Sequence, residues 1–330
     1  MTAEAAPPIS FDDVADAADR LRGVAVATPL LRNPHLDERV GGRLLIKPEV
    51  LQRTGSFKFR GAYNRISRLD PAERRRGVIA YSSGNHAQGV AAAAQLCGAP
   101  ALIVMPDDAP KVKKQGTLAW GAEIVGYDRR GGESREEVAE GLAAERGLSL
   151  VRPYDDPLIM AGQGTCGLEI VAQAAALDIA VDCVLVPCGG GGLTAGVATA
   201  VEAKCPAAEI YPVEPEGFDD TARSLASGAR QAARPDARSI CDALLAPEPG
   251  QLTFEVNRRL CTGGLVVSDA DVAAAMAVAF RDLKLVVEPG GAVALAAALS
   301  GKLDLAGRCA AIVLSGGNVD PDMYAGAIAH

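Results

Sequence analysis

The chain has 330 residues, which is more than one ordinary hydrophobic core takes up, so two domains or one large α/β unit are expected. Alanine, glycine and valine dominate and aromatic residues make up only 4%, a composition that favours parallel sheets covered by Ala-rich helices. The formal net charge is -8 and the basic residues are scattered, which argues against a nucleic-acid partner.

Secretion signals and membrane spans are not apparent in the sequence. The N-terminal residues are acidic, and no run of about 18 residues convincingly lacks both charges and helix breakers. The eight cysteines form no Cys-x-x-Cys pair and lie mostly in apolar stretches, which indicates reduced core residues. We therefore expect a cytoplasmic protein without a membrane partner.

Strand-like apolar runs alternate with helical patterns along nearly the whole chain, as in βαβ units that build a parallel sheet. Ser10 and the acids after it predict the cap and first turn of an opening helix. Other Ala-rich helices are expected at 86–97, 135–146 and 270–282. Eight strands are expected, at 43–50, 77–83, 100–106, 122–128, 148–154, 183–189, 209–215 and 310–317. The looser run 224–249 is the best candidate for a linker.

One lysine occupies an unusual position. Lys58 lies between Phe57 and Phe59 in the motif TGSFKFRGA, in a chain with only six phenylalanines. A buried lysine has a lowered pKa, and its neutral amine can form a Schiff base with an aldehyde. A short amphipathic strand or helix start explains the same nine residues, and the motif alone does not decide between the two interpretations.

A run of four glycines, 189–192, lies between a predicted strand and a predicted helix. Backbone N–H groups at such a helix start form a cradle for phosphate, although a tight turn without a ligand remains the alternative. Glu214 ends the next strand, where dinucleotide folds keep a ribose-binding acid, so an NAD-linked dehydrogenase is an alternative function. The spacing, however, does not give a clean GxGxxG, and Lys58 would have no role in such an enzyme.

A buried lysine, a phosphate cradle, an asparagine after a Ser-Ser-Gly turn and a serine at the last strand end together match the needs of pyridoxal phosphate. The motifs SFKFRGA, SSGNHAQGVA, AGQGT, PCGGGGL and VLSGGNVD follow one another in the chain. This ordered set resembles the fold type II pyridoxal-phosphate enzymes, specifically the group of serine/threonine dehydratases and serine racemases. The similarity extends from about residue 20 to about residue 320.

The resemblance implies an α/β fold like that of the tryptophan synthase β subunit, with two open, mostly parallel twisted sheets and flanking helices. Residues 1–76 and 155–330 would form a large cofactor-binding domain, and residues 77–154 a small domain. No C-terminal regulatory domain is expected. The usual state of the group implies a homodimer.

The resemblance also implies roles for individual residues. Lys58 would form the Schiff base and later remove the Cα proton of the substrate, with Phe57 beside the cofactor ring. Asn85 would meet the ring hydroxyl, and Ser315 would face the pyridine nitrogen. The phosphate would be held by Gly189, Gly190, Gly191, Gly192 and the N–H of Leu193.

The substrate is expected at the start of a helix, where its carboxylate would meet Ser82, Ser83, Asn85 and His86. His86 is equally well explained as a residue that caps the helix. Ser83 would lie on the ring face opposite Lys58 as a second catalytic group, and Arg135 would reach the substrate. The implied reaction is α,β-elimination from L-threonine or L-serine, which gives a 2-oxo acid and ammonia. Serine racemase and hydroxyaspartate dehydratase are the alternatives on the same scaffold.

An acidic motif, VEPEGFDD, matches the place where racemase-like members bind a divalent cation. Glu214, Asp220 and the carbonyl of Phe218 would bind Mg²⁺ or Ca²⁺, which prefer oxygen ligands. A solvated acidic turn is the alternative. Ala243 after Asp242 departs from the glycine that is common in the family, and Ala246 stands in place of a serine of the racemases, which favours a dehydratase. Glu288 would tune the cofactor or cap a turn.

Overall fold

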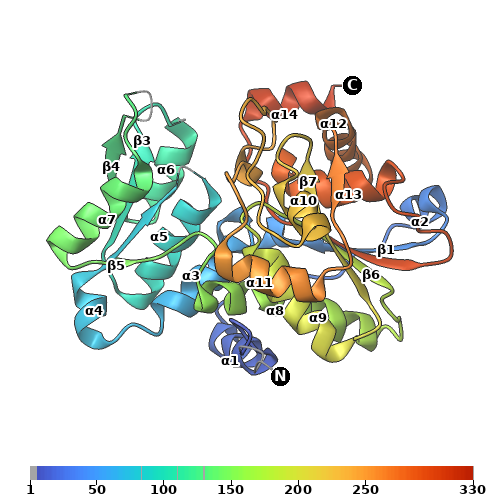
Figure 1. Ribbon diagram of the computed structural model, residues 1–330, viewed down its shortest axis with the longest axis horizontal. Coiled ribbons are helices and arrows are strands. Elements are labelled where there is room, and N and C mark those ends of the chain that lie inside the picture. Colours follow the sequence, from blue (N-terminus) through green and yellow to red (C-terminus); the bar gives the residue numbers. More distant parts are fainter. Residues whose placement is uncertain (1–5, 83, 110, 129–130, 330) are drawn as a thin grey trace.

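In the part of the chain that the structure describes, nine strands form two separate parallel sheets (Figure 1). The computed structural model describes residues 6–82, 84–109, 111–128 and 131–329. The five-stranded sheet has the order β1-β9-β6-β7-β8, built from β1 (Arg43–Pro48), β6 (Cys183–Pro187), β7 (Glu209–Pro215), β8 (Leu265–Val267) and β9 (Cys309–Leu314). The four-stranded sheet has the order β4-β3-β2-β5, built from β2 (Val78–Tyr81), β3 (Ala101–Pro106), β4 (Glu123–Tyr127) and β5 (Ser149–Leu150).

Helices flank both sheets. The described part of the chain contains α1 (Phe11–Leu21), α2 (Pro34–Val40), α3 (Lys58–Ile66), α4 (Pro71–Arg76), α5 (Asn85–Cys97), α6 (Lys111–Ala119), α7 (Arg135–Arg146), α8 (Pro157–Ala176), α9 (Gly192–Lys204), α10 (Asp220–Ser227), α11 (Gln251–Leu260), α12 (Asp269–Val278), α13 (Pro289–Leu299) and α14 (Pro321–Ile328). None of these is long and apolar enough to cross a membrane. The predicted α/β fold with two parallel sheets is confirmed.

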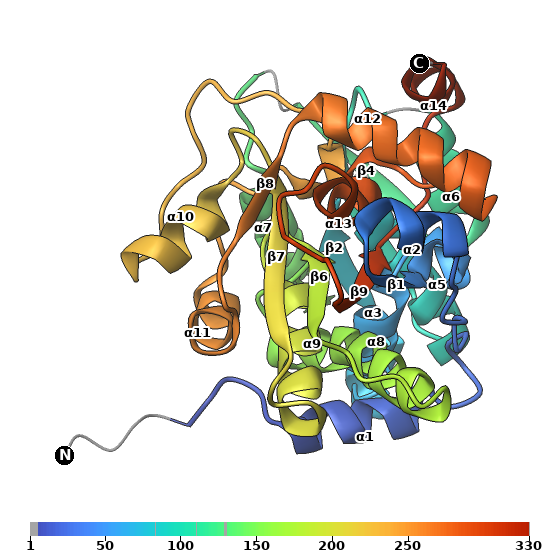
Figure 2. The ribbon, with the colours of Figure 1, turned by 90° about the vertical axis from the view of Figure 1, so that its right-hand side faces the viewer.

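The five-stranded sheet is buried on both faces. Leu44 and Ile46 of β1 pack in a core with α12 and α13, whereas Leu45 between them packs in a second core with α8 and α9. Figure 2 shows the two pairs of helices on opposite sides of the strands. A strand that is covered on both faces needs apolar residues at successive positions, which explains the continuous apolar runs in the sequence.

The sequence located the elements better than their ends. All eight predicted strands are present, but β5 covers only two residues of the predicted run 148–154. The capping box at Ser10 is confirmed, since its side chain accepts a hydrogen bond from the N–H of Asp13. The run 224–249 does not join the two sheets. It begins in the last turn of α10 and continues through a 3-10 turn at Asp242–Leu244, and the strands before and after it, β7 and β8, both belong to the five-stranded sheet.

Helix α3 lies where the two sheets come together. Its apolar residues Phe59, Ala62 and Ile66 share a core with α5 and with strands of the four-stranded sheet. The same helix packs against α8, which covers the five-stranded sheet. The four strands of the smaller sheet all fall within residues 77–154, and the division into a large and a small domain stays a prediction. Lys58, the first residue of α3, is thereby placed between the sheets.

Candidate active site

The carboxyl ends of β2, β6 and β9 open into one cleft of about 180 Å³ between the sheets. In parallel sheets ligands bind at these strand ends. The structure brings together in the cleft nearly all the residues predicted for the cofactor and the substrate, namely Phe57, Lys58, Ser82, Asn85, His86, Arg135, Gly189, Gly190, Gly191, Gly192, Leu193 and Ser315. Ser83 lies outside the described residues.

The two phenylalanines beside Lys58 have different surroundings. Phe59 is fully buried in the core, whereas Phe57 lines the cleft with its ring centroid 5.2 Å from the Lys58 ammonium nitrogen. The Lys58 Nζ donates a hydrogen bond of 2.7 Å to the carbonyl of Pro153. Burial lowers the pKa of Lys58 to about 8, although the nearby Glu288 carboxylate favours the charged form. A useful fraction of this amine is therefore neutral and nucleophilic at mildly alkaline pH.

The four glycines form a cradle of free N–H groups. Gly191 has a φ of 90°, in the left-handed region, and α9 begins at the next residue. No described residue accepts a hydrogen bond from the N–H groups of residues 189–193. The carbonyls of this loop accept hydrogen bonds from side chains of α11. Thr253 Oγ1 donates to the Gly190 oxygen at 2.7 Å, and Asn257 Nδ2 donates to the Gly191 oxygen at 3.4 Å. Free N–H groups at a helix start bind an anion such as phosphate.

The ring of Tyr154 lies directly on this loop. A Cβ added at Gly190 would lie 2.4 Å from the Tyr154 ring, so only glycine fits there. The next residue, Asp155, accepts hydrogen bonds from the first N–H groups of α11, including that of Leu252 at 2.8 Å. Helix α11 carries Thr253, which binds the carbonyl of Gly190. The segment after β5 thus packs against the glycine loop and also holds the helix behind it.

An amide and a buried acid face the same cleft. The Asn85 side chain donates to the Glu288 carboxylate and accepts a hydrogen bond of 2.7 Å from Asn318. Burial, together with the charge of Asp242, raises the pKa of Glu288 to about 8. Glu288 occupies the N-cap position of α13, but among the described residues its side chain makes no capping hydrogen bond to that helix. Ser315, which directly follows β9, is 4% exposed and lines the cleft.

The start of α5, where the substrate carboxylate is predicted to bind, borders the cleft. Ser82 Oγ accepts a hydrogen bond of 3.1 Å from the N–H of Gly84, the residue before the helix. His86 Nε2 lies 2.9 Å from the carbonyl of Val151. Burial and the Lys58 charge lower the pKa of His86 to about 3. The ring is therefore neutral, and its Nε2–H donates to Val151, which ties α5 to the segment after β5.

Basic side chains line the side of the cleft formed by the four-stranded sheet. Arg135 begins α7, and its guanidinium carbon lies 5.6 Å from the centroid of the Tyr81 ring. Its Nε donates a hydrogen bond of 2.8 Å to Glu136. Lys113 of α6 pairs with Asp242 across the cleft. Each of these two cations is paired with a carboxylate, Arg135 with Glu136 and Lys113 with Asp242.

The predicted cation ligands lie outside the cleft. Glu214 accepts hydrogen bonds of 2.9 and 2.8 Å from the N–H groups of Thr221 and Ala222 at the start of α10. Burial and the Asp220 charge raise the pKa of Glu214 to about 8, and Asp220 Oδ2 is buried without a hydrogen-bond partner among the described residues. That part of the chain contains no metal-binding group of three or more His, Cys, Asp or Glu side chains. Binding of Mg²⁺ or Ca²⁺ through Glu214, Phe218 and Asp220 stays a prediction.

Some cleft residues had no predicted role. Asn318 was within a recognised motif, but the hydrogen bond to Asn85 that defines its part in the site spans more than half the chain. Tyr154 and the ion pair of Lys113 with Asp242 depend on contacts between distant segments, and no spacing in the sequence indicates them.

The residues present fit pyridoxal phosphate. A desolvated amine, an anion cradle and a buried hydroxyl line one cleft, and a side chain at Gly190 would displace the ring that covers the cradle. A lysine can bind the aldehyde of such a cofactor, and the free N–H groups can bind its phosphate. The site and the fold therefore define an enzyme that uses this cofactor.

Comparison with known proteins agrees with the site. The family described as pyridoxal-phosphate dependent enzyme matches residues 22–316, and the chain belongs to this family. It is 43% identical over 316 residues, 96% of the chain and 97% of the relative, to an L-threo-3-hydroxyaspartate ammonia-lyase of Pseudomonas sp. The cofactor is therefore pyridoxal phosphate, and the NAD-linked alternative is excluded.

Two solved structures extend the comparison. A threonine deaminase of the organism abbreviated T.th. is 45% identical, with a TM-score of 0.88 over 94% of this chain and 99% of that one. Maize serine racemase is 38% identical, with a TM-score of 0.90 over 96% of this chain and 95% of that one. The chain is thus similar to lyases and to a racemase of hydroxy amino acids, within one family of pyridoxal-phosphate enzymes.

Proposed function

We propose that this chain is an ammonia-lyase that acts on L-β-hydroxy amino acids, namely L-serine, L-threonine and, preferentially, L-threo-3-hydroxyaspartate. The observation that carries the proposal is the Lys58 amine, held against the Pro153 carbonyl in the same cleft as the free N–H groups of the glycine loop. Bound pyridoxal phosphate supplies an electron sink for the bond cleavages at Cα and Cβ. Residues of the protein bind the substrate and transfer the protons.

Each part of the cleft has a role in this proposal. The N–H groups at the start of α5, with Ser82, bind the substrate α-carboxylate. The neutral Lys58 amine takes the Cα proton, and the β-hydroxyl leaves as water once it is protonated. The resulting enamine leaves the site, and its hydrolysis consumes a water and gives the 2-oxo acid and ammonia. Leu244 and Tyr154 cover the cleft from the side of the glycine loop.

The preference for a dicarboxylic substrate rests on Arg135. Arg135 lines the cleft. Its Nε donates to Glu136, and among the described residues the other N–H groups of the guanidinium have no acceptor. Arginine binds carboxylates with two parallel hydrogen bonds, so a β-carboxylate has a partner here that the methyl group of threonine lacks. The similarity to hydroxyaspartate ammonia-lyases supports the same choice.

Replacement of Arg135 tests the substrate preference. In Arg135→Gln we expect kcat/KM for L-threo-3-hydroxyaspartate to fall about 100-fold, because a charged hydrogen bond to the substrate is lost. The value for L-serine should change by less than about threefold. Release of 2-oxo acid measures both. Arg146→Gln at the far end of α7, where Arg146 pairs with Glu123, is the matched control. Equal losses on both substrates would show that Arg135 does not select the β-carboxylate.

Racemisation of serine is the second candidate, because maize serine racemase is a structural neighbour. Chiral analysis of the products from L-serine distinguishes the two activities, since a lyase releases 2-oxo acid and a racemase releases D-serine. Ala246, which lines the cleft in place of a serine, favours the lyase. The homodimer and the cytoplasmic location stay predictions.

The pH dependence of cofactor attachment tests the role of Lys58. Only the neutral amine adds to an aldehyde, and burial lowers the pKa of Lys58 to about 8. The rate at which the apoenzyme attaches pyridoxal phosphate should therefore rise with pH and level off above about pH 8. Borohydride trapping followed by peptide mass spectrometry measures attachment at Lys58. A midpoint near 10.5, the ordinary value for lysine, would contradict a desolvated amine.

A further inference from the structure

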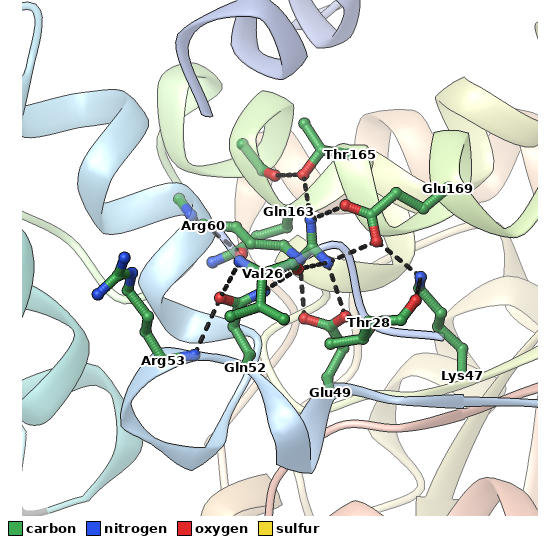
Figure 3. A network of polar contacts seen from close by, with 12 residues as sticks. Val26, Thr28, Lys47, Glu49, Gln52, Arg53, Arg60, Gln163, Thr165 and Glu169 are labelled. Carbon is green, nitrogen blue, oxygen red and sulfur yellow. Dashed lines mark hydrogen bonds and ion pairs between the residues drawn. The ribbon is translucent and has the colours of Figure 1, made fainter. Parts of the chain in front are cut away.

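Four charged side chains are packed together on the side of α3 that faces away from the cleft (Figure 3). Lys47 of β1, Glu49 after it and Arg60 of α3 are completely buried, and Glu169 of α8 is mostly buried. We call these four residues the Arg60 network. Two positive and two negative charges balance within it. No step of the proposed reaction uses any of them.

The geometry of the network is specific. Arg60 binds Glu49 through Nε at 2.7 Å and Nη2 at 2.8 Å, and binds Glu169 through Nη1 at 2.6 Å and Nη2 at 2.9 Å. Thr165 Oγ1 accepts a further hydrogen bond from Nη1 at 3.1 Å. Lys47 donates to Glu169 at 2.6 Å. Every N–H group of the guanidinium thus has an acceptor, either on α8 or on the segment that follows β1.

Stability alone does not explain the network. Removing four charges from water costs several kcal/mol for each ion, and apolar residues of similar size are often as stable in such places. Burial opposes ionisation of Glu49, but Arg60 outweighs it and keeps the pKa of that carboxyl below its usual value. What a guanidinium held by two carboxylates supplies, and apolar side chains do not, is one fixed orientation.

Helix α3 approaches its neighbours closely at glycines, and further along it is tied to α8 by a hydrogen bond of 2.7 Å from Asn64 Nδ2 to the Leu158 carbonyl. A Cβ added at Gly162 of α8 would lie 2.6 Å from the Cα of Gly61, and one added at Gly89 of α5 would lie 3.0 Å from the carbonyl carbon of Lys58. Contacts between glycine backbones let helices approach closely. Among the described residues no side chain caps the start of α3 at Phe57.

Lys58 and Arg60 point to opposite sides of α3. Two positions along a helix correspond to a rotation of about 200°. Lys58 therefore faces the cleft while Arg60 faces the core, in agreement with their contacts to Pro153 and to Glu49. A shift of α3 at Arg60 moves the amine by a similar distance, because only one residue separates the two.

We propose that Arg60 is a positioning residue, which holds the first turn of α3 through Glu49 and Glu169 so that the Lys58 amine reaches the cofactor aldehyde and the substrate Cα. This inference rests on the proposed role of Lys58. The network acts through the placement of the amine and does not touch the substrate.

The test is Arg60→Lys. This substitution keeps the positive charge but removes the guanidinium group that binds both carboxylates at once. Misplacement by about 1 Å lowers rates about 100-fold. We therefore expect kcat of the holoenzyme to fall about 100-fold with KM changed by less than about threefold. The rate of borohydride-trapped attachment of pyridoxal phosphate to Lys58 in the apoenzyme should fall by a similar factor. Arg65→Lys on the same helix, where Arg65 pairs with Asp156 of the α8 cap, is the matched control and should retain both rates.

Three outcomes separate the possibilities. If Arg60→Lys attaches the cofactor and turns over as fast as Arg65→Lys, the positioning role is wrong, whatever happens to the unfolding temperature. If the wild-type protein attaches no cofactor at Lys58, the proposed function itself fails. Should Arg60→Lys not fold, the double variant Glu49→Gln/Arg60→Met keeps the charges balanced through Lys47 and Glu169, and must show the same loss in kcat and in attachment rate.

Discussion

Lys58→Ala should leave a folded protein without lyase activity. No other amine occupies its place against the Pro153 carbonyl in the described part of the cleft, and the reaction needs this group both to hold the cofactor and to take the Cα proton. We expect kcat to fall on the order of 10,000-fold or more. The purified variant should also lack the visible absorbance band of the attached cofactor, which can be measured without substrate.

Lys47→Ala is not a suitable control for this experiment, because Lys47 belongs to the Arg60 network. Lys204 is better, since it lies at the end of α9 with its ammonium over the ring of Phe11, and its replacement by alanine should leave the band and the rate unchanged. A Lys58→Ala protein that still shows the band and the activity would place the attachment point elsewhere and overturn the assignment of the site.

Gly190→Val should yield a protein that folds but does not retain pyridoxal phosphate. A Cβ at this position would lie 2.4 Å from the ring of Tyr154, so the loop and the ring cannot keep their places. Overpacking combined with lost N–H contacts to phosphate should raise the cofactor Kd on the order of 1,000-fold. Titration of the apoenzyme with pyridoxal phosphate, followed by absorbance, measures the change.

The matched control is Gly141→Val in α7. There a Cβ would meet no described atom within 4 Å, so cofactor affinity should stay within about threefold of the wild type. If Gly190→Val binds the cofactor as tightly as Gly141→Val, the glycine loop is not the phosphate cradle. Circular dichroism of both apoenzymes shows that a loss of binding is not a loss of fold.

Much of the fold was predictable because buried parallel strands impose a strong pattern. Strands such as β6 and β9 are apolar at every position, and eight strand-like runs were found in the sequence. The short strand β8 was missed because its three residues lie at the sheet edge and two of them are partly exposed. The end of β5 was placed too late, because Val151 bonds to β2 only through its N–H, which donates to Ile79, while its carbonyl accepts a hydrogen bond from His86.

The site was predictable where a motif carries the chemistry, and less so where distant segments meet. Lys58 and the four glycines were found from local sequence, and the structure brings them into one cleft. The partners of Arg60 could not be found in this way, since Glu169 lies 109 positions away on another helix. Tyr154 is polar and is the last residue of a predicted strand, so its sequence position gives no indication that its ring covers Gly190.

Residues 151–155 connect several parts of the site. This short stretch accepts hydrogen bonds from His86 and Lys58 through its carbonyls, covers Gly190 with a ring and holds the start of α11 through Asp155. It is therefore in contact with α3, α5, α11 and the glycine loop. A displacement of this stretch would therefore disturb the hydrogen bond of the Lys58 amine and the contact with Gly190 together.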